Sequence, residues 1–316
     1  MFVGILILFL LPLAVRVALY AGKDRPASFD DADCSSVGML PPADADRDAR
    51  FLVFTGRTGR WKGIFAVHSW VVFKPENAAS WSRYDVVEWD QPVRTNGWAP
   101  DGRWFGDTPR VLVDVRGHAA AALIPKVKAA IATYGYSHSG DYRMWPGPNC
   151  NTFTATVLRA VPELETTLPS NAVCKDFRAY PYVGLTDSGT GVEASLWGLL
   201  GIKLGWVEGV EINVLGLVAG LDLRHPAVKL PGFGRVGVDD GTALAAPARA
   251  KWPVTPRKQA RANMEIAMHE NIRLTKRDTW IDSIIRRVQN NEMRTSPGAA
   301  HISAGTANTG AAQPTN

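Results

Sequence analysis

The chain has 316 residues, of which 46% are hydrophobic and 21% charged, a composition typical of a folded protein. The formal net charge is +5, and most of this excess lies between residues 257 and 287, where eight basic residues accompany four acidic ones. The remainder is nearly neutral, so we expect no nucleic-acid partner.

The first predicted element is a membrane anchor. Phe2 to Leu13 is almost wholly apolar and only Arg16 interrupts a run of about twenty residues, close to the length that spans a bilayer. No small-x-small cleavage site follows, so the sequence predicts a single-pass, uncleaved helix over residues 1–22 in the cell inner membrane. Basic residues after the segment favour a cytoplasmic body, but additional basic residues upstream would reverse this, so the orientation stays open.

Proline and aspartate dominate residues 23–49, which are predicted to form an irregular linker. Four strands are predicted next, at residues 50–55, 63–73, 83–90 and 110–115. A loop is expected over residues 91–108, and apolar residues at helical spacing predict a helix over residues 118–134.

The segment Trp145-Pro-Gly-Pro-Asn-Cys-Asn-Thr-Phe153 first breaks the chain and then begins a helix. Asn149 is the predicted N-cap, which places Cys150 in the first turn, where free N–H groups and the helix dipole favour a thiolate. His68 lies in a buried apolar strand. A thiol at a helix start and a histidine on a strand are a candidate nucleophile–base pair.

The chemistry of this pair predicts further roles. His68 would accept the Cys150 proton, the thiolate would attack a carbonyl, and the helix-start N–H groups would stabilise the oxyanion. A hairpin joining residues 74 and 83 would place His68 opposite Trp89, so Glu88 or Asp90 is predicted to orient the imidazole. Candidate substrate-binding residues are Tyr142, Trp145, Asn149 and Asn151.

The competing interpretation of these residues is structural. A cysteine in an apolar helix is commonly a small core residue, and a strand histidine is commonly only hydrogen-bonded. Cys34, Cys150 and Cys174 lack metal-ligand spacing, so no metal is expected. The segment Gly232-Phe-Gly-Arg-Val-Gly237 has dinucleotide-binding spacing but is not followed by a helix, so no cofactor is expected.

The C-terminal part changes character twice. Residues 192–223 are apolar and rich in glycine, and together with residues 227–230 they predict antiparallel strands. Farther on, apolar residues at helical spacing beside arginines predict a basic amphipathic helix, which would dock on the body or lie on an anionic membrane. Its apolar residues are Trp280, Ile281, Ile284, Ile285 and Val288.

These elements predict an α+β protein in five parts. The parts are a transmembrane anchor (1–22), a linker (23–49), an α+β core (50–180), a β-rich extension (181–245), and a basic amphipathic helix with a disordered tail (246–316).

Motifs in the chain resemble those of two groups of known families. Asn149-Cys-Asn-Thr-Phe153 resembles the N-C-x-x-F signature of circularly permuted papain-like enzymes, which include PPPDE peptidases, lecithin retinol acyltransferases and permuted NlpC-type hydrolases. In these families a strand histidine precedes a helix-start cysteine, as His68 precedes Cys150. The resemblance implies a permuted papain-like core with an antiparallel sheet, and thiol-dependent hydrolysis of an amide or ester, or acyl transfer.

The second resemblance covers the chain to about residue 240. Gly59-Arg-Trp-Lys-Gly-Ile-Phe-Ala-Val-His-Ser-Trp70, Asn96-Gly-Trp-Ala-Pro-Asp-Gly-Arg-Trp104 and Ser195-Leu-Trp-Gly-Leu-Leu-Gly201 are similar to an uncharacterised proteobacterial family, domain of unknown function 3750. This family implies an N-terminal hydrophobic segment and no particular activity.

Three functions remain open from the sequence. The first is a membrane-anchored thiol hydrolase or acyltransferase acting on a cell-wall peptide, a lipid or a protein. The second is a non-catalytic envelope protein that binds a lipid or peptide in the same cleft. The third is a membrane assembly factor that holds its partner through the basic C-terminal helix. Membrane lipid is the expected partner, through the anchor and the C-terminal helix.

Overall fold

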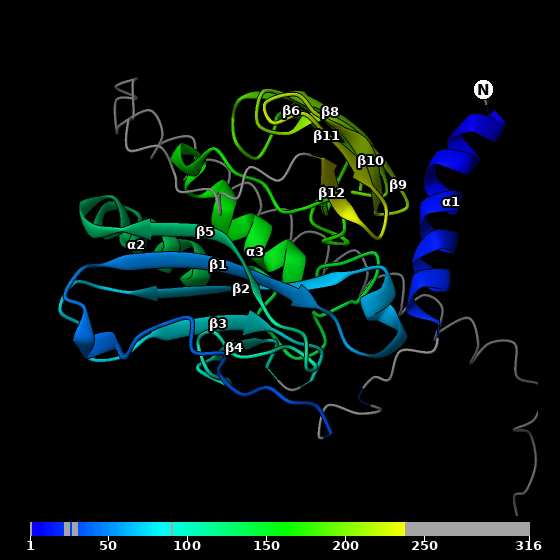
Figure 1. Cartoon of the computed structure of the whole chain (residues 1–316). Helices are drawn as coiled ribbons and strands as arrows, with labels where there is room; N and C mark the ends of the chain where they lie inside the picture. Colours follow the sequence, from blue (N-terminus) through cyan, green and yellow to red (C-terminus); the bar gives the residue numbers. More distant parts are fainter. Residues whose placement is uncertain (1, 22–25, 27–30, 90, 238–316) are drawn as a thin grey trace, which may run out of the picture. The chain divides into compact units, whose positions relative to one another are not determined.

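The computed structural model describes residues 2–21, 26, 31–89 and 91–237, all of which belong to one compact unit of the chain. Within this part the chain forms two antiparallel sheets, of five and seven strands, and three α-helices (Figure 1). The predicted α+β class is therefore confirmed. The predicted C-terminal amphipathic helix and tail lie outside the described residues.

The first sheet has the strand order β4-β3-β2-β1-β5. Its strands are β1 (Arg50–Arg57), β2 (Val67–Lys74), β3 (Ser82–Val86), β4 (Val93–Thr95) and β5 (Arg110–Arg116). The central strands β1 and β2 are almost continuously apolar because both of their faces are covered. Strand β4 falls in the predicted loop 91–108, so that part of the prediction was wrong.

Different structures cover the two faces of this sheet. Helices α2 (Gly117–Ala132) and α3 (Cys150–Arg159) pack on the face that carries Phe51, Val71 and Phe73. On the other face lie aromatic side chains from loops, which enclose buried residues of β1 and β2. The largest residues of this second cluster are Phe54, Trp70, Trp81 and Trp104.

Seven strands in simple sequential order make the second sheet. They are β6 (Tyr182–Leu185), β7 (Gly191–Leu196), β8 (Leu200–Gly205), β9 (Gly209–Val214), β10 (Leu217–Asp222), β11 (Ala227–Leu230) and β12 (Gly234–Gly237). The connections are short: Leu215 and Gly216, both with positive φ, make the two-residue turn between β9 and β10. Such turns follow the twist of an antiparallel pair and need φ above zero, which explains glycine at this point.

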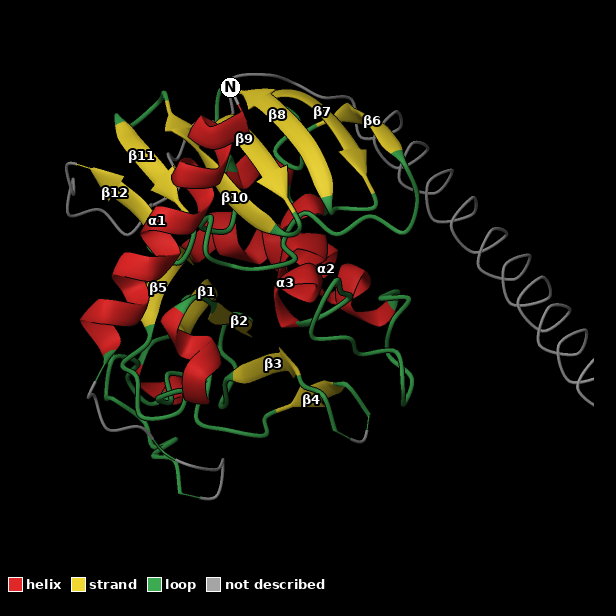
Figure 2. Ribbon diagram, turned by 90° about the vertical axis from the view of Figure 1, so that its right-hand side faces the viewer, coloured by secondary structure: helices red, strands yellow, loops and turns green. Residues whose placement is uncertain are grey.

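Helix α1 (Phe2–Tyr20) lies against β10 and β11 (Figure 2). One side faces the body, with Phe9 and Arg16 buried, and the Arg16 Nε donates to the Ile64 carbonyl at 3.0 Å. In residues 2–21, 31–89 and 91–237, no helix is long and apolar enough to cross a membrane. The transmembrane anchor that the sequence predicts is therefore not supported.

Candidate functional site

The site begins at the N-terminus of α3, which the Asn149 side chain caps. Its Oδ1 accepts hydrogen bonds from the backbone N–H groups of Asn151 and Thr152, at 2.9 and 3.2 Å. Its Nδ2 donates to the carbonyls of Met144 and Val173. Cys150 is consequently the first helical residue, as predicted, and the loop before it is tied to the helix by the same side chain.

Replacing Asn149 with alanine is expected to lower the free energy of unfolding by about 1–2 kcal/mol, because the cap and both loop contacts are lost. Urea unfolding followed by circular dichroism measures the loss. Asn149→Asp is the comparison variant, since it keeps the acceptor for the helix N–H groups but replaces the donor to the two loop carbonyls with a charged oxygen. A full loss in Asn149→Asp would mean that the loop contacts, rather than the cap, stabilise this region.

Asn151 joins α3 to the strand that carries His68. Its Oδ1 accepts from the Ser69 hydroxyl at 2.8 Å, and its Nδ2 donates to the carbonyls of Val67 and Val173, each at 3.0 Å. The side chain is buried and fully occupied by these bonds. Asn149 and Asn151 therefore position the helix start, and neither has a polar group left over for the substrate contacts that the sequence predicts.

A buried carboxylate orients His68. The His68 Nε2 lies 3.0 Å from Asp85 Oδ1, and Asp85 also receives two hydrogen bonds from the Arg83 guanidinium, at 2.7 and 2.9 Å. Burial raises the pKa of Asp85, but Arg83 and His68 outweigh it and hold that pKa below its usual 3.8. An ionised Asp85 only accepts hydrogen bonds, so the Nε2 atom of His68 carries a proton.

Stacked aromatic rings fix the plane of the imidazole. The His68 ring lies parallel to the Trp104 indole, with centroids 3.9 Å apart and planes 10° apart. Gly56 is the cross-strand neighbour of His68, and a Cβ there would come within 3.2 Å of Trp104 Cβ. The missing side chain at Gly56 therefore makes room for Trp104, and an indole face beside His68 favours the imidazolium form.

The Cys150 thiol is a further neighbour of His68 and acts on its pKa. Burial lowers the pKa of His68, but the neighbouring Cys150 and Asp85 raise it more, from 6.5 to about 9. His68 therefore stays protonated at neutral pH. The stability that this shift contributes is present below pH 6.5 and is lost as the pH rises through about 9.

The strand register excludes Glu88 from the role predicted for it. Strand β2 pairs with β3 so that Val71 faces Tyr84 and Phe73 faces Ser82, which differs by two residues from the predicted hairpin. Glu88 is exposed, and Asp90 lies outside the described residues. The predicted register was wrong, and the carboxylate beside His68 is Asp85.

The two remaining predicted residues lie on the loop before α3. Tyr142 is half-buried and packs against the core cluster that contains Cys150. Burial raises the pKa of Tyr142, and Cys150 raises it further, so its hydroxyl remains a neutral donor. Trp145 is 52% exposed, and its indole N–H donates to the Leu215 carbonyl at 2.9 Å, so it links this loop to the second sheet.

Few N–H groups at the helix start are available to an oxyanion. Asn149 occupies those of Asn151 and Thr152, and the Phe153 N–H donates to the Asn149 carbonyl. Among the described hydrogen bonds, none uses the Cys150 N–H. The predicted group of oxyanion donors is therefore reduced to the N–H of Cys150 itself.

Asp85, Arg83 and Trp104 were not among the site residues predicted from the sequence. The alternation Arg83-Tyr-Asp85 contained a usable signal, because two charged residues spaced by two in an apolar strand share one face and point to a buried ion pair. The described residues hold no group of three or more histidine, cysteine or carboxylate side chains placed to bind a metal ion.

Comparison with known proteins finds one family model that resembles the core, and its description names no activity. Residues 48–177 match the family described as "Protein of unknown function (DUF3750)". This range begins just before β1 and ends beyond α3, so it contains His68, Asp85 and Cys150. Neither the curated proteins nor the solved structures contain a significant match.

Proposed function

We propose that this protein is a thiol-dependent hydrolase or acyltransferase that uses Cys150 as nucleophile, His68 as base and acid, and Asp85 as the group that positions His68. The observation that carries the proposal is the buried hydrogen bond from His68 to Asp85 beside Cys150, which together with Asp85 raises the pKa of His68. This is the arrangement by which an enzyme activates a weak nucleophile.

The proposed reaction proceeds through a thioester. In the resting pair His68 already holds the proton that it has taken from Cys150, and the thiolate attacks the carbonyl carbon of an amide or ester. The oxyanion accepts a hydrogen bond from the Cys150 N–H. In other enzymes, removing such a donor costs about 3–4 kcal/mol of transition-state stabilisation. The imidazolium then protonates the leaving amine or alcohol. Water, or the hydroxyl or amine of an acceptor, attacks the thioester and restores the thiol.

The order of the three residues supports a permuted papain-like core. A strand histidine (β2), a carboxylate on the neighbouring strand (β3) and a cysteine at a later helix start (α3) follow one another along the chain. The substrate is proposed as a cell-wall peptide, a lipid ester or a protein amide.

The burial of the pair is the observation that favours the alternative, a non-catalytic binding protein. Cys150 is only 7% exposed and His68 only 3%. Residues around the thiol must move before a carbonyl carbon reaches it. A binding protein would use the same region without forming a covalent bond. Acylation of Cys150 therefore distinguishes the two functions.

Labelling of Cys150 tests the pair directly. A Cys34→Ser parent removes the half-buried thiol, and Cys174 adds little background because burial raises its pKa to about 12. Iodoacetamide labelling of Cys150 at pH 7, followed by peptide mass spectrometry, is expected to slow about tenfold or more in His68→Gln. An unchanged rate would contradict the nucleophile–base pair.

A p-nitrophenyl ester tests for the covalent step. Intact mass spectrometry is expected to show one acyl group on the parent and none on Cys150→Ser. Turnover of an alkyl ester, whose alkoxide must be protonated to leave, is expected to fall as the pH rises through about 9, because the imidazolium that supplies this proton is lost there. Absence of acylation at every pH would favour the binding protein.

A further inference from the structure

In the second sheet the usual distribution of side chains is reversed: charged residues lie on the buried face and aliphatic residues lie on the exposed face. Its strand register assigns alternate residues to two faces. One face carries charged residues that are buried, among them Glu193, Lys203, Glu211 and Lys229. Ion pairs satisfy them: Lys203 lies 2.6 Å from Asp176, and Lys229 lies 2.6 Å from Glu211.

The opposite face, here named the apolar face, has no polar side chain in any of the seven strands. Its residues are Val183, Leu185, Val192, Ala194, Leu196, Leu200, Ile202, Leu204, Val210, Ile212, Val214, Leu217, Ala219, Leu221, Val228, Leu230, Gly234 and Val236. Many are open to solvent: Ile202 is 54% exposed and Leu204 55%.

The apolar face is as large as the largest apolar patches that soluble monomers expose. Strands β7 to β10 have six residues and are about 20 Å long, whereas β6, β11 and β12 have four; the seven strands span about 29 Å, which gives at most roughly 600 Å². That is at the upper limit of the largest apolar patch on a typical soluble monomer. Leaving aliphatic side chains in water costs about 25 cal/mol per Å² of apolar surface, so an occupant is strongly favoured.

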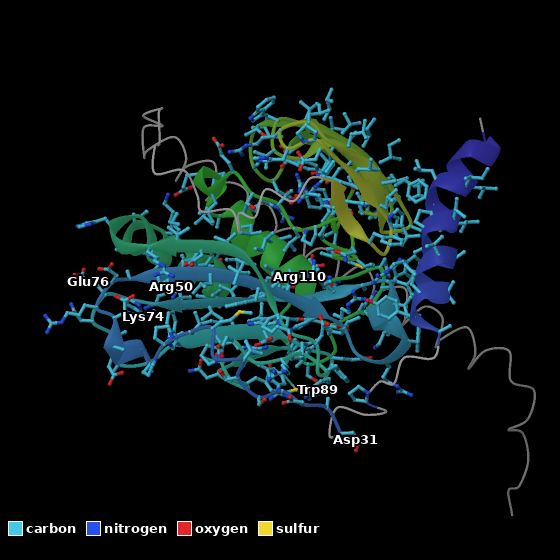
Figure 3. The ribbon with its side chains drawn as sticks, in the orientation of Figure 1. Asp31, Arg50, Lys74, Glu76, Trp89 and Arg110 are labelled. Atoms are coloured by element: carbon cyan, nitrogen blue, oxygen red, sulfur yellow. The ribbon has the colours of Figure 1, made fainter. Side chains whose placement is uncertain are left out.

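Helix α1 enlarges this surface and gives it relief. It contacts β10 and β11 (Figure 2), and Ala219, on the apolar face of β10, is buried. The sides of α1 that point away from the body are aliphatic, and Figure 3 shows only carbon in the side chains that project from it. The helix thus stands as an apolar ridge on an apolar sheet.

A lipid bilayer fits this surface better than a protein does. Protein interfaces mix apolar side chains with a polar rim, whereas the strands of this face offer no hydrogen-bonding side chain at all. A second copy would need a groove to receive α1, but fluid acyl chains adapt to a ridge. Trp197 and Trp206 are half-exposed in the turns at opposite ends of β8, where a flat-lying sheet meets the headgroups that indoles prefer.

We propose that the apolar face and α1 form one membrane-binding surface that lies flat on a lipid bilayer and buries its aliphatic side chains among the acyl chains. Backbone groups inside the sheet remain paired with neighbouring strands, so this orientation exposes only side chains to lipid. The proposal is independent of the chemistry at Cys150.

Flotation of the full chain with phosphatidylcholine vesicles in 1 M salt tests it. Neutral headgroups and high salt suppress binding through the basic residues between 257 and 287. The parent chain is expected to float with the vesicles. The variant Ile202→Lys/Leu204→Lys is expected to bind on the order of tenfold more weakly or worse, because two half-exposed aliphatic side chains of β8 become charged.

The matched control is Met39→Lys/Gln91→Lys, which adds the same charge at exposed positions outside the apolar face and α1. It is expected to float as the parent does, and both variants are expected to keep the parent's circular dichroism spectrum. Lipids brominated on the acyl chains are expected to quench tryptophan fluorescence in the parent, and to quench less of it in Trp197→Phe/Trp206→Phe.

Three results would overturn the proposal. The parent chain does not float, or the β8 variant floats as well as the parent. In the third, sedimentation without detergent shows a dimer that the β8 variant dissociates while vesicle binding is absent, which would mean that a second copy covers the face. A Cys150→Ser chain is expected to bind vesicles normally, so failure here is separate from failure of the proposed acyl chemistry.

Discussion

Acyl transfer by the Asp85→Asn variant is expected to fall at least tenfold, and by as much as about 10⁴-fold, the loss known for the equivalent change in a serine protease. The amide would donate to His68 Nε2, which forces the ring proton onto Nδ1, the reverse of the tautomer that Asp85 favours. The steady-state rate with a p-nitrophenyl ester at pH 7 measures the effect.

The same variant is expected to lose about 3 kcal/mol or more of stability. The Arg83 guanidinium is fully buried, and Asp85 is its charge partner, so a neutral amide leaves a buried cation uncompensated. Asp85 has a lowered pKa, and its contribution is therefore present above pH 3.8 and lost as the pH falls through its value in the folded protein.

Removing both charges separates the two effects of this substitution. In Arg83→Leu/Asp85→Leu the buried guanidinium is gone together with its partner, so stability is expected to recover relative to Asp85→Asn. The acyl-transfer rate is expected to stay low because His68 still lacks its acceptor. Recovery of both quantities would show that Asp85 serves only to neutralise Arg83 and has no part in positioning the imidazole.

Lys203→Met is expected to be the most destabilising substitution in the second sheet, at about 3–5 kcal/mol. Lys203 is buried and lies 2.6 Å from Asp176 and 3.5 Å from Glu193. Burial lowers the pKa of Lys203, but Asp176 and the other carboxylates outweigh it and raise it above its ordinary value. Thermal unfolding and urea titration measure the loss.

An exposed lysine provides the control for this prediction. Lys126 forms an ion pair with Glu163 but is 53% exposed, so Lys126→Met is expected to cost about 0–1 kcal/mol. Equal losses in the two variants would mean that the buried network contributes no more than an ordinary surface pair. The prediction for Lys203 would then be wrong.

Local chemistry made part of the site predictable from the sequence. The N-cap at Asn149 and the helix after it depend on neighbours within three residues, so the helical position of Cys150 could be read directly. The strand of His68 followed from its apolar run. Asp85 could not be placed, because its position depends on the turn between β2 and β3, whose length the sequence does not fix.

The alternation of side chains between the two faces of a strand would have narrowed the choice of the carboxylate beside His68. Residues of β3 that share a face with His68 are odd-numbered, since Tyr84 is paired with Val71 on the other face. Asp85 satisfies this rule, whereas the even-numbered candidates Glu88 and Asp90 do not. The second sheet shows the reverse difficulty: its alternation was visible, but charged residues turned inward could not be expected from the usual burial of apolar residues.

The buried charges of the second sheet also determine which residues of its strands can align. A two-residue slip of β8 against β9 would keep every aliphatic side chain on the same face, where leucine, isoleucine and valine pack almost interchangeably. It would, however, move Lys203 away from Glu211, its cross-strand neighbour, and leave buried charged side chains without their partners. The apolar side therefore carries little information about alignment. The buried ionic face therefore fixes the strand register. Substitutions among the aliphatic residues of the apolar face are expected to leave that register unchanged.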